Sequence, residues 1–471
     1  SRLIRVGAGG PAPADAAVTS AAVTSADGGP AWFLEVAPRG SADVRSWLRR
    51  VEMGVMTDTM SGAMTGGADR DGSLHVFFDL HARIAAEELD PELGVMVRCV
   101  WFDAGDERPG RLLVLIHHLV IDGVSWRVLL ADLATVWSAL SAGAVPRLEP
   151  VPTSYRRWAR RLAERAQDPG REAQLPFWTE LLARGGPLPR PAGTTYHGDR
   201  AGVASAQPVT VSVPGAAALL SSVPAAFDAG VDELLLTALS LAIADCRRRW
   251  CGGDPTGVLV AVEGHGRQEQ VVDDLDLSRT VGWFAEVFPI CLEHDPIDLE
   301  TCAAGFAVHR GARPGDAGLG DAGLGDARGV ASALDAAVSA TRVRMAAIPD
   351  GGTGYNLLRH LNPRTAPVLA TARQPDIYFN YEGRLARPEP VDWAVAAEDE
   401  TLFAGWNEDR PDPFALSVIV RAVDRADGPE LIARWTSGPG GLPTDAVRDL
   451  ALSWTWALGA LRWRAGQLGR H

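Results

Sequence analysis

The chain has 471 residues, of which 46% are hydrophobic and 22% charged, and its formal net charge is −14. This composition is typical of a globular protein, and the length suffices for about three domains or two large lobes. The acidic balance argues against a nucleic-acid backbone or an anionic membrane as a partner. No secretory signal core opens the sequence, and the longest apolar stretch, 234–244, is too short to cross a bilayer. Five scattered cysteines without a CxxC pair indicate reduced thiols, so we expect a cytoplasmic protein.

The first half of the chain alternates between strand-like and helix-like patterns. Strand-like segments at 1–6 and 31–36 flank a stretch rich in Ala, Gly, Ser and Pro, which predicts a flexible loop over 7–30. Two further strands are predicted within 94–103 and 110–120. Apolar residues then recur at helical spacing, which predicts an amphipathic helix over 126–140, and a second helix is predicted near 154–166.

The pattern is interrupted at 183–200, a Pro- and Gly-rich stretch without apolar period, and then starts again. A strand at 208–214, a helix over 232–250 opened by an Asp cap, and a strand at 257–264 follow. The repetitive stretch 315–329 predicts a mobile surface loop. We therefore predict an α/β protein with an N-terminal lobe over 1–185, a linker over 186–200 and a C-terminal lobe over 201–471.

The stretch "LIHHLVIDGVSW", residues 115–126, places two histidines at the end of an apolar run. A strand that leads into His-x-x-x-Asp-Gly displays the imidazole of His118 at the strand end. There Asp122 can pin the loop, and Gly123 provides an unrestricted φ for the turn. An imidazole is the natural group for proton transfer near neutral pH. A buried core histidine and a metal ligand are the alternatives, although no metal-binding spacing accompanies the motif.

The motif resembles the histidine motif of condensation-superfamily domains in nonribosomal peptide synthetases. Four later stretches narrow the resemblance to the epimerization domains of these synthetases: "VEGHGR" (262–267), "DLSRTVGWF" (276–284), "PDGGTGY" (349–355) and "YFNYEG" (378–383). The resemblance covers roughly residues 30–460. It implies two chloramphenicol-acetyltransferase-like lobes in a V-shaped arrangement, with the active site in a tunnel between them.

The resemblance also implies the reaction, which is inversion of the α-carbon of an aminoacyl or peptidyl thioester. Inversion requires one group to remove the proton next to the carbonyl and another to return a proton to the opposite face. The resemblance assigns these roles to His118 and Glu263. An apolar site would raise the proton affinity of the Glu263 carboxylate. Which of the two residues takes the first proton stays open.

Other site residues are implied in supporting roles. We interpret His117 as a structural, backbone-bonded histidine. We interpret Asp122 as an anchor for its loop, with an Arg as the partner considered, rather than as a proton-transfer group. Arg267 is interpreted as structural, as a group that orients Glu263, or as a contact for the phosphate of the carrier's arm. The supporting set is His117, Asp122, Gly123, Arg267, Asn380 and Tyr381, and the floor of the tunnel is assigned to Trp283 and Phe284.

The resemblance implies no permanently bound cofactor and no metal. The substrate would arrive on the 4′-phosphopantetheine arm of a peptidyl carrier protein, and neighbouring synthetase domains would be the other partners. Two alternatives remain at this point: a condensation domain that forms peptide bonds with the same histidine, and a non-catalytic member that only docks carriers.

The sequence departs from the family pattern in three places. Asn356 replaces the Gly that usually follows "GxGY", and Asn can still adopt a left-handed conformation. Glu382 replaces a Leu and, on a strand, would face away from Tyr381. The family's opening helix and its "HHDxLR" stretch are absent from this sequence, so we expect the first lobe to lack its first helix and strand.

Overall fold

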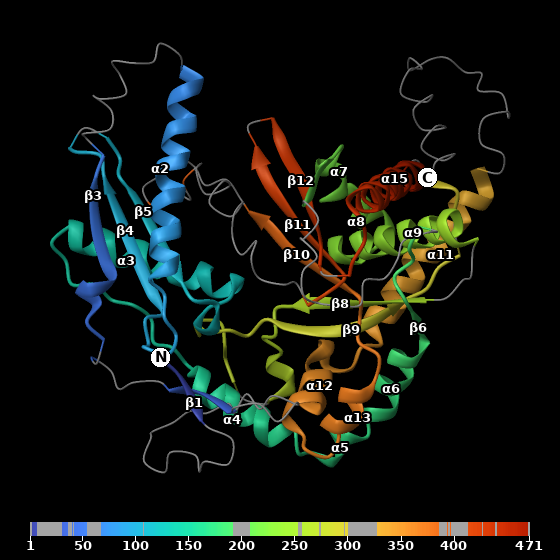
Figure 1. Ribbon diagram of the computed structural model, residues 1–471, viewed down its shortest axis with the longest axis horizontal. Helices are drawn as coiled ribbons and strands as arrows, with labels where there is room; N and C mark the ends of the chain where they lie inside the picture. The colour runs from blue at the N-terminus through green and yellow to red at the C-terminus, as the bar shows by residue number, and fades with distance from the viewer. Residues whose placement is uncertain are drawn as a thin grey trace. The chain divides into compact units, whose positions relative to one another are not determined.

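The computed structural model (Figure 1) describes residues 2–6, 31–35, 40, 42–53, 67–106, 108–191, 208–252, 257–272, 275–295, 297–299, 327–385, 393, 396, 413–425, 427–438 and 440–469. Its contacts divide the chain into two compact units, and each unit is described by itself. Unit 1 comprises residues 1–161, 272–284 and 388–408, and unit 2 comprises residues 162–271, 285–387 and 409–471.

These units are not the contiguous lobes that we predicted. The first boundary falls after Arg161 rather than at 185, because helix α6 (Leu175–Arg184) packs against strand β9 (Glu286–Leu292) of unit 2. Residues 272–284 lie beyond the predicted linker but are part of unit 1, to which they are hydrogen-bonded. Most of the predicted linker, residues 192–200, is outside the described residues, as is the predicted flexible loop 7–30.

Unit 1 contains a small mixed sheet with a helix packed on it (Figure 1). Strand β4 (Val97–Asp103) pairs parallel with β3 (Leu48–Glu52) and antiparallel with β5 (Arg111–Ile116). Helix α2 (Gly67–Glu87) contributes Phe78, whose ring meets that of Phe102 on β4 edge to face at 4.8 Å. The other described elements of the unit are β1 (Arg2–Val6), β2 (Ala31–Glu35), η1 (Val44–Trp47), η2 (His118–Val120), α3 (Gly123–Ser141) and the first turns of α4 (Tyr155–Arg165).

Unit 2 is built on a sheet that has seven strands among the described residues, in the order β6-β8-β10-β11-β12-β7, with β9 also paired to β8. Strand β8 lies inside this sheet, parallel to β10 and antiparallel to β9. Its first six residues are buried, and such a continuous apolar run is expected of a strand covered on both faces. The strand bounds are β6 (Gly185–Gly186), β7 (Val209–Val213), β8 (Gly257–Gly264), β9 (Glu286–Leu292), β10 (Ile377–Leu385), β11 (Leu416–Arg425) and β12 (Gly428–Ser437).

Helices α9 and α15 pack against each other in unit 2 (Figure 1). Their apolar faces join the main core, where the buried rings of Trp435 and Trp454 meet at 5.6 Å. The helical elements of this unit are α5 (Pro169–Glu172), α6 (Leu175–Arg184), α7 (Ala216–Leu219), α8 (Ser222–Phe227), α9 (Val231–Cys251), η3 (Glu269–Val271), α11 (Ala327–Ala346), η4 (Pro349–Gly352), α12 (Thr353–Asn356), η5 (Leu357–Leu361), α13 (Ala366–Thr371) and α15 (Thr444–Leu468).

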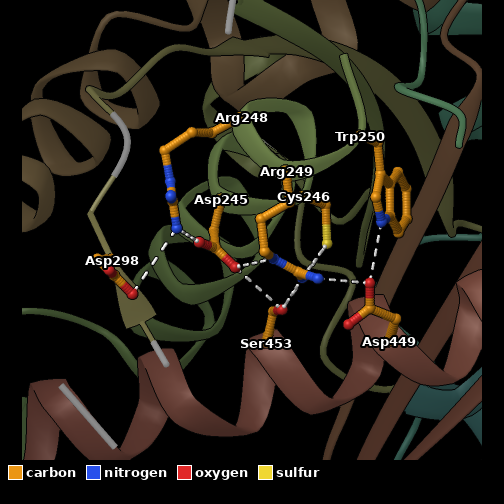
Figure 2. Close-up of polar contacts among 8 residues, drawn as sticks. All are labelled: Asp245, Cys246, Arg248, Arg249, Trp250, Asp298, Asp449 and Ser453. Carbon is orange, nitrogen blue, oxygen red and sulfur yellow. Dashed lines mark hydrogen bonds and ion pairs between the residues drawn. The ribbon is translucent and has the colours of Figure 1, made fainter. Parts of the chain in front are cut away.

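A buried polar cluster joins α9 to α15, and Figure 2 shows its contacts. Asp245 is fully buried and accepts hydrogen bonds from Arg248 at 2.8 Å, Arg249 at 3.0 Å and Ser453 at 3.2 Å. Arg249 also donates to Asp449 on α15 at 2.6 Å. A buried carboxylate is tolerated only when charged or polar partners satisfy it, so this cluster fixes the register of the two helices.

Two local predictions need correction. Helix α9 is capped at Gly230 rather than by an Asp: the Gly230 N–H donates to the Glu233 carboxylate at 2.7 Å, which leaves Asp232 in the first turn. The stretch 315–329 is not a loop throughout, because α11 begins at Ala327; residues 315–326 are outside the described set. Among the helices that the structure describes, none combines the length and apolarity needed to cross a bilayer.

Candidate functional site

His118 begins a single 3-10 turn directly after β5. The preceding residue, His117, turns the chain: its N–H donates to the Met96 carbonyl at 2.9 Å, and its Nδ1 accepts the Leu119 N–H at 3.2 Å. His117 is therefore bonded to the backbone on both sides, whereas the His118 side chain is exposed and its ring lies 5.1 Å from that of Trp283. The turn therefore exposes the imidazole of His118, while the imidazole of His117 is hydrogen-bonded within the turn.

Asp122 closes this turn and starts α3. The buried carboxylate accepts the Ser125 N–H at 2.8 Å as a helix N-cap, and its second oxygen accepts the Phe284 N–H at 2.9 Å. Asp122 thus anchors its loop, and the contact at its second oxygen is the backbone of a segment far along the chain. The His118 turn and residue 284 are held by the same carboxylate.

Ser125 strengthens the link between α3 and the stretch 276–284. Its hydroxyl is fully buried, donates to the Gly282 carbonyl at 2.9 Å and accepts the Gly282 N–H at 3.1 Å. A Cβ at Gly282 would come within 2.3 Å of the Tyr155 ring, so only glycine permits this approach. The Tyr155 hydroxyl donates to the Trp283 carbonyl at 2.7 Å, and burial raises the pKa of this phenol to about 12, with the charge of Asp122 adding to the effect.

Trp283 and Phe284, the two aromatic residues assigned to the floor of the tunnel, lie in different environments. Phe284 is buried, with ring centroids 5.1 Å from Tyr155 and 6.1 Å from Trp158. Trp283 is 42% exposed and lies beside His118. Gly282 and Phe284, the residues on both sides of Trp283, are hydrogen-bonded to Ser125 and Asp122. The indole is therefore held next to the imidazole of His118. The sequence placed Trp283 in the site but gave no sign of this neighbour.

Gly123 does not act as we predicted. It is the first residue of α3 and its φ lies outside the left-handed region, so the conformational freedom of glycine is not used there. A Cβ at this position would meet no atom within 4 Å. Gly123 therefore borders open space at the start of α3.

Glu263 stands at the end of β8 in unit 2 and is half-buried. Both of its carboxylate oxygens receive hydrogen bonds from β10: the Tyr378 hydroxyl donates to Oε2, and the Asn380 amide donates to Oε1 at 3.2 Å. The parallel register explains this contact, because Tyr378 pairs with Ala261 and the strands continue side by side. Asn380 was predicted near the site and Tyr378 was not.

Alternation along β10 decides which of its side chains meet Glu263. Tyr378 and Asn380 share one face, whereas the Tyr381 side chain packs against the main hydrophobic core. Glu382 faces away from Tyr381, as predicted. It forms an ion pair with Arg421 at 3.1 Å, and burial raises its pKa, an effect increased by the charge of Glu263. The period-2 pattern of "YFNYEG" could have identified Tyr378 once the face was known.

The turn after Glu263 is stabilised locally. The Arg267 N–H donates to His265 Nδ1 at 3.0 Å, and Gly266 adopts a left-handed conformation with φ 62°. Of the three roles considered for Arg267, neither an orienting contact with Glu263 nor a phosphate contact is tested by these contacts, so both stay predictions.

A second carboxylate, Glu286, lies on β9 opposite Gly264. Thr353 donates to its Oε1, and Asn356 donates to Oε2 at 3.3 Å. Burial raises the pKa of Glu286 to about 7, and the charge of Asp350 adds to this effect. The left-handed conformation open to Asn356 is not used: the residue is right-handed, with φ −64° and ψ −38°, and its amide donates to Glu286.

The structure therefore gathers the site residues in two groups. His118, Asp122 and the 282–284 segment come together in unit 1, and Glu263 with Asn380 comes together in unit 2. The joint action of His118 and Glu263 stays a prediction, as does the tunnel. Within the described ranges, no group of three or more His, Cys, Asp or Glu side chains is arranged to hold a metal ion.

Comparison with known proteins identifies a common family. The family profile of the condensation domain matches residues 80–303. One component of the linear gramicidin synthase of Brevibacillus parabrevis is 32% identical over 405 residues, which is 84% of this chain but 7% of that protein. Chondramide synthase of Chondromyces crocatus is 35% identical over 297 residues, which is 62% of this chain and 6% of that protein. The chain thus spans only a small part of the length of these relatives.

Solved structures share the fold. The epimerization domain from the third module of tyrocidine synthetase B aligns with a TM-score of 0.63 and 23% identity, covering 94% of this chain and 85% of that one. The first condensation domain of the calcium-dependent antibiotic synthetase aligns with a TM-score of 0.54 and 16% identity, covering 94% and 83%. The predicted α/β fold of acetyltransferase-like lobes is confirmed.

Proposed function

The chain belongs to the condensation-domain superfamily, and from this premise we propose that it is an epimerase of nonribosomal peptide synthesis. Its substrate is an aminoacyl or peptidyl group held as a thioester on the phosphopantetheine arm of a peptidyl carrier protein, and neighbouring synthetase domains are its other partners. The reaction interconverts the L and D forms at the α-carbon.

The chemistry needs only proton transfer. A base takes the α-proton, the electron pair of the broken C–H bond moves into the thioester carbonyl to form an enolate, and an acid then returns a proton to the opposite face of the α-carbon. We assign these two roles to His118 and Glu263. Protonation at the α-carbon forms a new C–H bond and converts the enolate back to the thioester, so no oxidant, reductant or permanently bound cofactor takes part.

The observation that carries the proposal is the environment of Glu263. Its carboxylate is half-buried and receives hydrogen bonds from both Tyr378 and Asn380, so its orientation is fixed, which supports the proposed role. His118, the other residue of the pair, is exposed beside Trp283 in the unit that carries the histidine motif. Peptide-bond formation with the histidine alone would leave this organised carboxylate without a role.

The test is exchange of solvent deuterium into the α-position of carrier-bound thioesters. We expect exchange with the wild-type protein and a loss of at least about 100-fold in Glu263→Gln and His118→Ala, the size typical of removing a general acid or base. Glu430→Gln, a carboxylate change on β12, is the matched control and keeps the wild-type rate. Chiral analysis of the released acyl group identifies the side chain that is inverted.

Three outcomes contradict the proposal. Exchange at the wild-type rate in both variants removes His118 and Glu263 from the chemistry. A new amide formed when donor and acceptor carriers are both supplied, with no exchange, identifies a condensation domain instead. Carrier binding without exchange on any substrate identifies a non-catalytic docking member of the family.

A further inference from the structure

The hydroxyl of Tyr378 is hydrogen-bonded to Glu263, the proposed acid–base residue, although no sequence signal assigned Tyr378 to the site. Its hydroxyl donates to Glu263 Oε2 in unit 2, while its ring stacks on Phe414 at 5.2 Å with an interplanar angle of 24°. Two independent contacts therefore fix the side chain, one through the ring and one through the hydroxyl. A tyrosine held this way has a defined position relative to the carboxylate.

We propose that Tyr378 is a positioning residue for Glu263, which fixes the orientation of the carboxylate and favours its ionised form. This inference rests on the proposed function, because it concerns the same acid–base group. A carboxylate that accepts hydrogen bonds binds a proton less readily, since the donors stabilise its charged form. The Asn380 amide acts on the other oxygen in the same sense.

The opposing influence comes from the same strand. Glu382 is the nearby like charge, and it is itself paired with Arg421 of β11 at 3.1 Å. On β9, the residue opposite Glu263 is Val287, which carries no charge. Among its contacts, Glu263 therefore has two neutral donors on β10 and one like charge, Glu382, which is itself paired with Arg421. Tyr378 and Asn380 offset the repulsion from Glu382.

The phenol is suited to this role because it stays protonated. Burial raises the pKa of Tyr378, and the negative charge of Glu263 raises it further. The hydroxyl therefore keeps its proton through the neutral range and remains a donor while Glu263 gains and loses its own. A residue that shared the proton would be catalytic; Tyr378 instead sets the pH at which Glu263 works.

Tyr378→Phe removes the hydroxyl and keeps the ring that stacks on Phe414. We expect the acid-side midpoint of the kcat/KM profile for deuterium exchange to move up by about one pH unit, the shift expected when a charged group loses one hydrogen bond. Replacing Tyr378 by 3-fluorotyrosine, whose hydroxyl is a stronger donor, should move the midpoint down. The matched control is Tyr355→Phe, which removes a buried hydroxyl bonded to Gln374 and should leave the midpoint in place.

A second measurement does not depend on activity. Infrared difference titration of the wild-type protein against Glu263→Gln reports the protonation of Glu263 itself, and the same titration in Tyr378→Phe should show a higher midpoint. If the wild-type protein exchanges no deuterium on any substrate, the proposed function fails while this titration still tests Tyr378. An unchanged midpoint in Tyr378→Phe overturns the positioning role, whether or not exchange occurs. A lower unfolding temperature with no change of midpoint indicates a structural role only and likewise overturns it.

Discussion

Glu286 makes the stability of unit 2 depend on pH in an unusual direction. Its carboxyl is bonded to Thr353 and Asn356, and burial raises its pKa from 4.5 to about 7. Because the folded state binds this proton more tightly than the unfolded chain, the contribution to stability is complete below the unfolded pKa. It is lost as the pH rises through 7. Most buried carboxylates with charged partners behave in the opposite way.

Glu286→Gln measures the size of this effect. One pKa unit corresponds to about 1.4 kcal/mol. The free energy of unfolding of the wild-type protein should therefore fall by about 2.5 kcal/mol between about pH 5 and about pH 8 because of this group. Glutamine keeps an oxygen that accepts from Thr353, and the Asn356 amide can turn over so that its oxygen accepts from the new NH₂. The variant should therefore be close to wild type near pH 5 and more stable by about 2 kcal/mol near pH 8.

The assay is urea unfolding followed by circular dichroism at a series of pH values, with the m-value checked for each variant. Glu430→Gln is the control of opposite sign. Hydrogen bonds from Ser212 and Arg425 lower the pKa of Glu430, so its contribution is present at neutral pH and lost as the pH falls. A stability difference between Glu286→Gln and wild type that is the same at both ends of the pH range would refute the reasoning.

Two substitutions test the packing described above by their effect on the free energy of unfolding. Asp245→Ala should lower it by about 3–5 kcal/mol, because two guanidinium groups and a hydroxyl lose their buried acceptor, whereas Asp445→Ala, at a 96% exposed side chain, should change it by less than about 1 kcal/mol. Equal effects in urea unfolding would contradict the role of burial. Gly282→Ala should lower it by about 1–3 kcal/mol through the clash with Tyr155, while Gly123→Ala, in open space, should leave it unchanged or raise it. A thermally neutral Gly282→Ala variant would show that the close approach is not required.

Local patterns predicted the elements that carry the proposed chemistry. The apolar run before His118 is β5, the amphipathic helix after Gly123 is α3, and the strand ending at Glu263 is β8. Each of these depends on periodicity within a few residues, which a sequence displays directly. The family signature then identified the fold.

The neighbours of these residues could not be predicted in the same way. Ser125 bonds to Gly282 across a separation of 157 residues, and no local pattern encodes such a pairing. The same holds for Tyr378, whose side of β10 is decided by the strand beside it. Glu286 and Asn356 each look like isolated polar residues in the sequence, and only the structure shows that they are hydrogen-bonded to each other. Long-range partners, rather than secondary structure, were the missing information.

The return of residues 272–284 to unit 1 has a consequence for synthesis on the ribosome. The His118 turn is bonded through Asp122 and Ser125 to Phe284 and Gly282, so unit 1 lacks these contacts until residue 284 has emerged. Domains of long chains generally fold in order from the N-terminus. More than a hundred residues of unit 2, 162–271, are therefore synthesised before unit 1 can complete these contacts.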